Sequence, residues 1–185
     1  MRLTAHVHQR LRPLLVPGAP GLDATAGAGH DTLFLARTLD PGPVHALDIQ
    51  PAALERTRAR LAAADAGENV TLHHADHSEP DRVLPAALRG RFAVALFNLG
   101  YLPGRTDGPT TEPVATLAAL EAVSAWLAPE GLLSVVAYRG HLGGQAEAEA
   151  VGRWMKGHRS VVEKRDTGGE GPVWWLVRAP LASPP

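Results

Sequence analysis

The chain has 185 residues, the length of one α/β domain whose core needs no crosslink, and we expect residues 1–185 to fold as a single domain. It has no cysteine, which excludes disulfide bridges, a thiolate nucleophile and a zinc site built from sulfur. Its formal charge of -1 at pH 7 excludes a general attraction to nucleic acid, so any RNA contact has to be local.

The sequence carries no signal for a membrane or for export. No apolar run approaches the roughly 20 residues that span a bilayer. Residues Met1 to Pro20 lack the apolar stretch and the small-residue cleavage site of a secretory signal. We therefore expect a cytoplasmic protein without a membrane partner.

Short apolar runs alternate with longer helical patterns, which is typical of parallel βαβ units. The amphipathic opening segment has its apolar positions at Leu3, Val7, Leu11, Leu14 and Leu15. The strands that follow are expected at Gly21–Thr25, Val44–Asp48, Val70–His74, Phe92–Asn98 and Leu132–Tyr138. The helices between and after them are expected at Asp31–Leu39, Pro51–Ala64, Asp81–Leu88, Glu112–Leu127 and Gly144–Gly157.

The end of the chain has a different pattern. Ser160–Lys164 and Val173–Arg178 are strand-like, and turn residues fill Asp166–Gly171 between them, which predicts an antiparallel hairpin. Together with the earlier strands, this hairpin predicts an α/β fold with a Rossmann-like, doubly wound sheet of seven strands.

The segment Asp23–Thr32 joins the first strand to the first helix, where α/β proteins bind nucleotide-type cofactors. Gly27 and Gly29 allow a sharp turn and a close approach to a ligand, and the helix start offers unpaired N–H groups. A dinucleotide-binding turn would have glycine where Thr32 stands. The acid Asp23 instead suits the cationic α-amino group of S-adenosylmethionine, directly or through water, and would repel a pyrophosphate. A merely tight turn is the structural alternative.

We expect cofactor contacts throughout this turn. Asp31 and Thr32 have an equal alternative, because both are good residues for capping a helix. The expected cofactor-binding residues of the turn are Asp23, Thr25, Gly27, Gly29, His30, Asp31 and Thr32.

The second and third strands also end in polar residues. Asp48 follows the glycines by about 20 residues, where an acid accepts both ribose hydroxyl hydrogens; capping the next helix is the alternative. Gln50 is expected beside it. Asp76 is expected to contact the adenine amino group, with His77 flanking the ring. Neighbouring histidines on a strand point to opposite faces, so no metal site is predicted.

The fourth strand ends in a polar amide and an aromatic ring. Asn98, Leu99, Gly100 and Tyr101 resemble the Asn/Asp-Pro-Pro-aromatic motif of amino-methyltransferases, with both prolines replaced. In that motif the amide oxygen and the next backbone carbonyl orient the target nitrogen, which implies these catalytic roles for Asn98 and Leu99 and places Asn98 at the cofactor as well. Tyr101 is expected to stack on a planar base. The alternative is that Asn98 caps a turn and Tyr101 packs in the core.

Two glycine-rich loops follow the fourth and fifth strands at the same edge. Thr110 and Thr111 are expected to reach the substrate or the methionine carboxylate, with helix capping as the alternative. Tyr138, Arg139 and His141 are expected to bind substrate, Arg139 at a phosphate and His141 as a relay for the amine proton. Solvated loop side chains are the alternative for these two.

The segments Asp23–Thr32, Phe97–Pro103, Thr110–Thr111 and Tyr138–Gly143 together resemble the small bacterial class I methyltransferase family labelled "putative rRNA methylase". The resemblance implies S-adenosylmethionine as cofactor and a tRNA anticodon stem-loop as partner. It also implies N-methylation of the aminomethyl group of wobble 5-aminomethyl-2-thiouridine. One departure is Ala28, where the resemblance implies a larger polar residue such as asparagine.

Other interpretations stay open. The family label favours an rRNA methyltransferase, and the near-neutral charge favours a small-molecule amine methyltransferase. A homodimer is compatible with the sequence.

Overall fold

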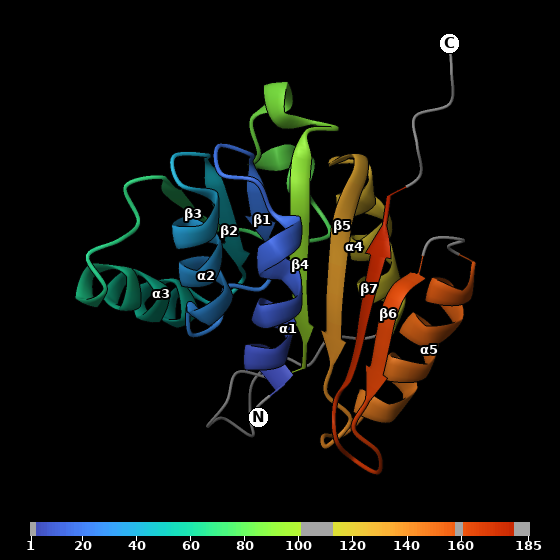
Figure 1. Ribbon diagram of the computed structural model, residues 1–185. Helices are drawn as coiled ribbons and strands as arrows, with labels where there is room; N and C mark the ends of the chain where they lie inside the picture. Colours follow the sequence, from blue (N-terminus) through green and yellow to red (C-terminus); the bar gives the residue numbers. More distant parts are fainter. Residues whose placement is uncertain (1–2, 101–112, 158–160, 180–185) are drawn as a thin grey trace.

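A mixed sheet runs through the centre of the structure, a computed structural model that describes residues 3–100, 113–157 and 161–179 (Figure 1). Its strands lie in the order β3-β2-β1-β4-β5-β7-β6. Strands β1 to β5 are parallel, whereas β7 runs antiparallel to both β5 and β6. The strands are β1 Gly21–Asp23, β2 Val44–Asp48, β3 Val70–His74, β4 Phe92–Leu99, β5 Leu127–Ala137, β6 Val161–Asp166 and β7 Val173–Arg178. The predicted doubly wound sheet of seven strands with a C-terminal antiparallel hairpin is confirmed.

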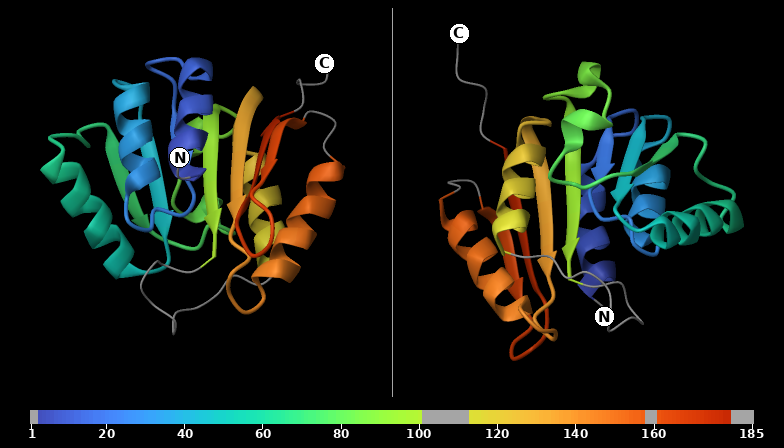
Figure 2. Two further views of the ribbon diagram at one scale, coloured as in Figure 1. Left: turned by 60° about the horizontal axis from the view of Figure 1, so that its bottom comes forward. Right: turned by 180° about the vertical axis from the view of Figure 1, so that it is seen from behind.

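Helices cover both faces of the sheet (Figure 2). One layer consists of α1 Leu3–Leu11, α2 His30–Leu39 and α3 Pro51–Ala63, and the other of α4 Pro113–Ser124 and α5 Gly144–Lys156. Two of these helices begin at proline, whose fixed φ and missing N–H suit the first helical turn. Among the described residues, none of the helices combines the length and the apolar character needed to cross a membrane.

The last strand, β7, contributes side chains to the hydrophobic cores on both faces of the sheet. Val173, Trp175 and Val177 of β7 pack among the side chains of α4 and α5, while Trp174 and Leu176 pack with those of α1 and α2. Successive side chains of a strand point to opposite faces, so a fully apolar strand indicates burial on both. This explains why β7 lacks the polar and apolar alternation of a surface strand.

The predicted helix over Asp81–Leu88 is wrong. Two separate 3₁₀ turns, Pro80–Arg82 and Ala86–Leu88, stand there instead. Pro85 lies between them, and proline both lacks an N–H and disfavours the helical conformation of the residue before it. In this segment the prolines therefore indicated the absence of an α-helix better than the apolar spacing indicated its presence.

Several other boundaries shift by one or two residues, and the two largest differences concern β5 and α4. Strand β5 begins at Leu127 rather than at Leu132, because Leu127 pairs with Phe92 before a register shift. Helix α4 consequently ends at Ser124. The predicted start of that helix at Glu112 lies outside the described residues.

The chain passes from β3 at one edge of the sheet back to β4, which lies beside β1, so the direction of winding changes between β1 and β4. Strand β1 pairs with β2 on one side and with β4 on the other. In open α/β sheets, ligands bind at the carboxyl ends of the strands at such a switch point. These ends lie at the bottom of Figure 1, next to the turn of the β6–β7 hairpin.

Candidate functional site

A cavity of about 480 Å³ opens at the carboxyl ends of β1, β2 and β4. Its wall comes from the turn after β1, the start of α2, the residues after β2, β4 and β5, and single residues of α1 and of the β6–β7 turn. The predicted site residues that line it are Thr25, Gly27, His30, Asp31, Asp48, Gln50, His77, Asn98, Tyr138 and His141. Residues far apart in the sequence therefore converge on one cavity.

Other predicted residues lie elsewhere. Tyr101, Thr110 and Thr111 fall outside the described residues. Those within the described residues that are not part of the cavity wall are Asp23, Gly29, Thr32, Asp76, Leu99 and Arg139.

The glycine turn is built on left-handed backbone. Gly27 has φ of 55° and Gly29 has φ of 75°, a region that residues with a Cβ rarely adopt. A Cβ at Gly29 would also lie 2.8 Å from the Cα of Thr57 on α3. Gly29 caps the start of α2, and its N–H donates to the carbonyl of Ala26 at 2.8 Å. Gly29 thus lies on the side of the turn that packs against α3, while Gly27 faces the cavity.

Asp48 links the glycine turn to the tip of β2. Its Oδ2 accepts the N–H of Gly27 at 2.9 Å, and its Oδ1 accepts the N–H of Gln50 at 2.9 Å. Gln50 is the N-cap residue of α3, so Asp48 binds the residue that precedes the helix and is not its cap. Each carboxylate oxygen has further acceptor capacity, and Asp48 lines the cavity. The carboxylate is therefore held where ribose hydroxyls can donate to it.

Asp23 is completely buried beneath the turn. Its Oδ1 accepts the N–H of Thr25 at 3.1 Å, and its Oδ2 accepts the hydroxyl of Thr32 at 2.6 Å. Burial, followed by the nearby charge of Asp31, raises the pKa of Asp23 to about 7. The hydrogen bonds of Asp23 with Thr25 and Thr32 thus stabilise the turn. The cofactor contact expected of Asp23 and Thr32 stays a prediction.

This pKa predicts a pH-dependent difference in stability. The unfolded chain releases the Asp23 proton near the ordinary pKa of 3.8, whereas the folded protein holds it up to about pH 7. The stabilising contribution is fully present below the unfolded pKa and is lost as the pH rises through the folded pKa. We expect the stability of the native protein, relative to Asp23→Asn, to fall between about pH 4 and about pH 7. Urea unfolding of both proteins across this range tests it; parallel curves would contradict it.

Asp76 and His77, the two predicted site residues that follow β3, have different surroundings. Asp76 is exposed, and its Oδ1 accepts both the N–H and the hydroxyl of Ser78 at 2.7 Å. His77 lines the cavity, lies edge-on to the ring of Phe97 with 5.5 Å between centroids, and its Nδ1 is 3.2 Å from the carbonyl oxygen of Ala24. The flanking position expected for His77 agrees with this placement, while the adenine contact of Asp76 stays a prediction.

Asn98 stands at the centre of the site. Its backbone N–H donates to the hydroxyl of Thr25 at 2.7 Å, and its Nδ2 donates to Oδ2 of Asp31 at 2.6 Å. An ionised carboxylate only accepts hydrogen bonds, so the amide nitrogen has to face Asp31. This leaves Oδ1 of Asn98 to act as an acceptor. The next carbonyl, that of Leu99, accepts the N–H of Tyr138 in the sheet at 3.0 Å, so its expected role stays a prediction.

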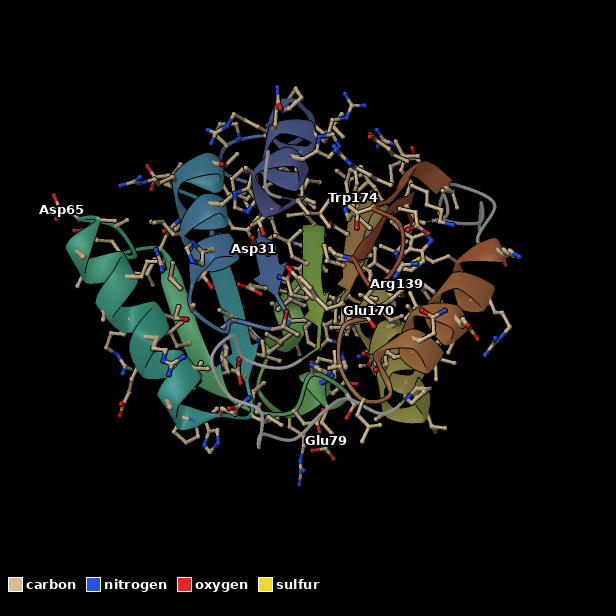
Figure 3. All side chains as sticks on the ribbon, turned by 90° about the horizontal axis from the view of Figure 1, so that it is seen from below. Asp31, Asp65, Glu79, Arg139, Glu170 and Trp174 are labelled. Carbon is tan, nitrogen blue, oxygen red and sulfur yellow. The ribbon has the colours of Figure 1, made fainter. Side chains whose placement is uncertain are left out.

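Asp31 and His141 line the cavity, whereas Arg139, which like His141 follows β5, does not. Figure 3 shows Asp31 at the middle of the sheet edge and Arg139 to one side, by the hairpin. The guanidinium of Arg139 donates to Asp166 at 2.6 Å and to the carbonyl of Gly171 at 2.6 Å, so it anchors the hairpin rather than facing the cavity. His141 does line the cavity, with Nδ1 3.0 Å from the carbonyl oxygen of Leu142.

Tyr138 makes contact with the first helix. Its hydroxyl hydrogen-bonds to Thr4 of α1, and burial raises the pKa of the phenol. Sequence reasoning did not place any residue of α1 in the site, yet Thr4 lines the cavity and His8 contacts Asp31. Glu170, from the β6–β7 turn, is a further lining residue that was missed. The available signal was the spacing of Thr4 and His8, which share one face of a helix.

Comparisons with known proteins agree with this architecture. A model of the family described as "Putative rRNA methylase" matches residues 44–161. The tRNA (mnm(5)s(2)U34)-methyltransferase, chloroplastic, of Arabidopsis thaliana is 36% identical over 159 residues, which make up 81% of this chain and 57% of that protein. The chain thus spans little more than half the length of this relative.

Two solved structures resemble the whole described fold. A "putative rRNA-methylase" from Clostridium thermocellum has a TM-score of 0.84 at 28% identity, with 94% of this chain and 95% of that chain covered. A "putative methyltransferase" from Streptococcus mutans, in complex with S-adenosylhomocysteine (SAH), has a TM-score of 0.80 at 28% identity, with 96% and 98% covered. The chain therefore belongs to the family described as "Putative rRNA methylase" and has the α/β fold of the class I, S-adenosylmethionine-dependent methyltransferases.

Proposed function

We propose that the protein is an S-adenosylmethionine-dependent N-methyltransferase that acts on tRNA, with the aminomethyl group of wobble 5-aminomethyl-2-thiouridine as the acceptor. The observation that carries this proposal is the position of Asn98, which lines the same cavity as the glycine turn with its amide nitrogen bound to Asp31. The name of the Arabidopsis relative supports the choice of acceptor.

The cavity fits the cofactor. Its volume of about 480 Å³ lies within the range of about 300 to 1,000 Å³ that is usual for small-ligand sites. Asp48 suits the ribose, and the left-handed turn at Gly27 lets backbone approach the ligand closely. His77 offers a ring face beside the space for the base. When bound, S-adenosylmethionine supplies an electrophilic methyl group.

The side chains at β4 suit an amine acceptor. Oδ1 of Asn98 can accept one N–H of the amine and so fix the direction of the nitrogen lone pair. Such alignment accounts for a large part of the barrier lowering in a displacement that needs no other covalent chemistry from the protein. Tyr138 and His141 form the wall beyond it, where the rest of the substrate would lie. The tRNA anticodon stem-loop as partner, the cytoplasmic location and a homodimer remain predictions.

An rRNA substrate is the second candidate, because the family description names rRNA. Incubating the protein and S-adenosylmethionine with tRNA that carries 5-aminomethyl-2-thiouridine, and in parallel with ribosomal RNA, separates the two. Mass spectrometry of the nucleosides is expected to show one added methyl group on the aminomethyl-thiouridine. Unchanged tRNA with methylated rRNA would favour the second candidate. If neither RNA is modified, the proposed RNA substrates are wrong.

A further inference from the structure

A hydrogen-bonded series of side chains joins the first helix to the centre of the cavity. Nε2 of His8 lies 2.5 Å from Oδ1 of Asp31, and Oδ2 of Asp31 accepts the amide of Asn98 at 2.6 Å. The imidazole is stacked on the ring of Phe34, with 4.1 Å between centroids and 5° between planes. The side chain of Asp31 is 9% exposed, yet the residue lines the cavity. A carboxylate at the centre of the cavity is thus held in one orientation from two sides.

The proposed reaction needs a group that takes up a proton. An alkyl amine has a pKa near that of lysine, about 10, so at neutral pH its nitrogen carries a proton and has no lone pair. Attack on a methyl group forms the N–C bond and breaks the C–S bond, whose electron pair goes to sulfur. The ammonium therefore has to lose one proton first, while the electron pair of that N–H bond stays on nitrogen.

We propose that Asp31 accepts this proton from the acceptor amine and that His8 is the positioning residue that aims the carboxylate. This inference rests on the proposed function. The transfer converts an ammonium and a carboxylate into an amine and a carboxylic acid, so the net charge of the pair is zero before and after the step. After release of the methylated product, the Asp31 carboxyl gives its proton to water. Asn98, bound to the other oxygen, then orients the neutral amine.

The titratable groups that face Asp31 come from several elements. They include His8 on α1, Asp23 on β1 and Tyr138 after β5. The charge of Asp31 contributes to the raised pKa of both Asp23 and Tyr138. Asp23, with its pKa of about 7, titrates within the useful pH range, so Asp23→Asn is measured alongside to subtract its contribution.

The decisive variant is Asp31→Asn, which keeps the size of the side chain but cannot take up the proton. We expect its kcat to be about 100-fold below the wild type at neutral pH, a typical loss for a general base. The deficit should shrink steadily from about pH 7 to about pH 9.5, because more of the amine is already deprotonated in solution. Asp65→Asn makes the same change in an exposed carboxylate at the edge of the molecule and is expected to leave kcat unchanged (Figure 3). A deficit that stays constant over this range would overturn the proposal.

The role of His8 needs a separate comparison. His8→Phe keeps an aromatic ring on Phe34 but loses the contact with Asp31, whereas His8→Gln has an amide that can donate to it. We expect kcat to fall about tenfold in His8→Phe with little change in KM, and to recover in His8→Gln. Equal kcat in both variants and the wild type would exclude the positioning role. The same measurements on His141→Gln test the rival proton acceptor: a deficit that shrinks with rising pH in this variant, and not in Asp31→Asn, would overturn the proposal.

A measurement without turnover keeps this inference separate from the proposed function. Infrared difference spectra are recorded when an anticodon stem-loop with 5-aminomethyl-2-thiouridine binds the SAH-loaded protein. A band of a protonated carboxyl group is expected in the wild type and not in Asp31→Asn. Binding without this band would overturn the role of Asp31 even if methylation is observed. Absence of both binding and methylation would instead count against the proposed substrate and, with it, against this role for Asp31.

Discussion

Replacing Asn98 with alanine is expected to lower kcat by about a thousandfold while changing the affinity for SAH by less than about threefold. The expected loss is large because the amide is the acceptor held between the glycine turn and Asp31, and its backbone N–H stays bound to Thr25. Removing the side chain frees the orientation of the amine without touching Asp48 or Gly27. Steady-state kinetics with the modified tRNA and calorimetry with SAH measure the two quantities.

Asn69→Ala is the matched control. The amide of Asn69 donates to the carbonyls of Ala36 and Gly42 at 3.1 Å and 2.8 Å, so its loss should lower the melting temperature and leave kcat of the folded protein unchanged. Near-normal turnover by Asn98→Ala would remove Asn98 from the catalytic site. An equal loss of SAH affinity and kcat would show that Asn98 acts on cofactor binding instead.

Gly29→Ala is expected to lower the free energy of unfolding by about 2 to 4 kcal/mol and to weaken SAH binding at least about tenfold. Part of the loss comes from the left-handed backbone, where a Cβ costs about 1 to 2 kcal/mol. The remainder comes from the backbone of Thr57, 2.8 Å from the new Cβ, which forces the turn or α3 to move. Since Gly29 does not line the cavity, lost affinity would report displacement of Gly27 and its neighbours.

Gly90→Ala separates the two causes. Gly90 has φ of 71°, and a Cβ there meets no atom within 4 Å. This variant should lose only the backbone contribution of about 1 to 2 kcal/mol and bind SAH normally. Urea unfolding and calorimetry of both variants give the comparison. If Gly29→Ala matched Gly90→Ala in both measurements, the close packing of the turn on α3 would not matter for the site.

The architecture was predictable because five of the seven strands, β1, β2, β4, β5 and β7, are mostly buried and two helices begin at proline. The apolar run at Val44–Asp48 and the proline at Pro51 mark a strand and a helix start without knowledge of the fold. Prediction failed where two signals conflicted. Between Asp81 and Leu88 the apolar spacing favoured a helix, and Pro85 prevented one. The early start of β5 depends on pairing with Phe92, which is a tertiary contact.

The site was predictable where it lies on a strand end or the turn that follows it. Asp48 and Asn98 reach the cavity because parallel strands end at one edge. Which carboxylate of the glycine turn faces the cavity was not readable from spacing: Asp23 is buried below it and Asp31 is in its wall. His8 and Asp31 are separated by 23 residues, and their contact depends on how α1 packs against α2. The sequence shows that Thr4 and His8 share one face of a helix, but not which residues that face contacts.

A crystal structure of the protein with SAH would locate the cofactor. We expect Asp48 to accept hydrogen bonds from the ribose hydroxyls and the backbone of Gly27 to border the ligand. We also expect the sulfur to lie on the side of the cavity where Asn98 presents Oδ1. A ligand bound at another edge of the sheet, or an Asn98 amide turned away from the sulfur, would exclude methyl transfer at this cavity.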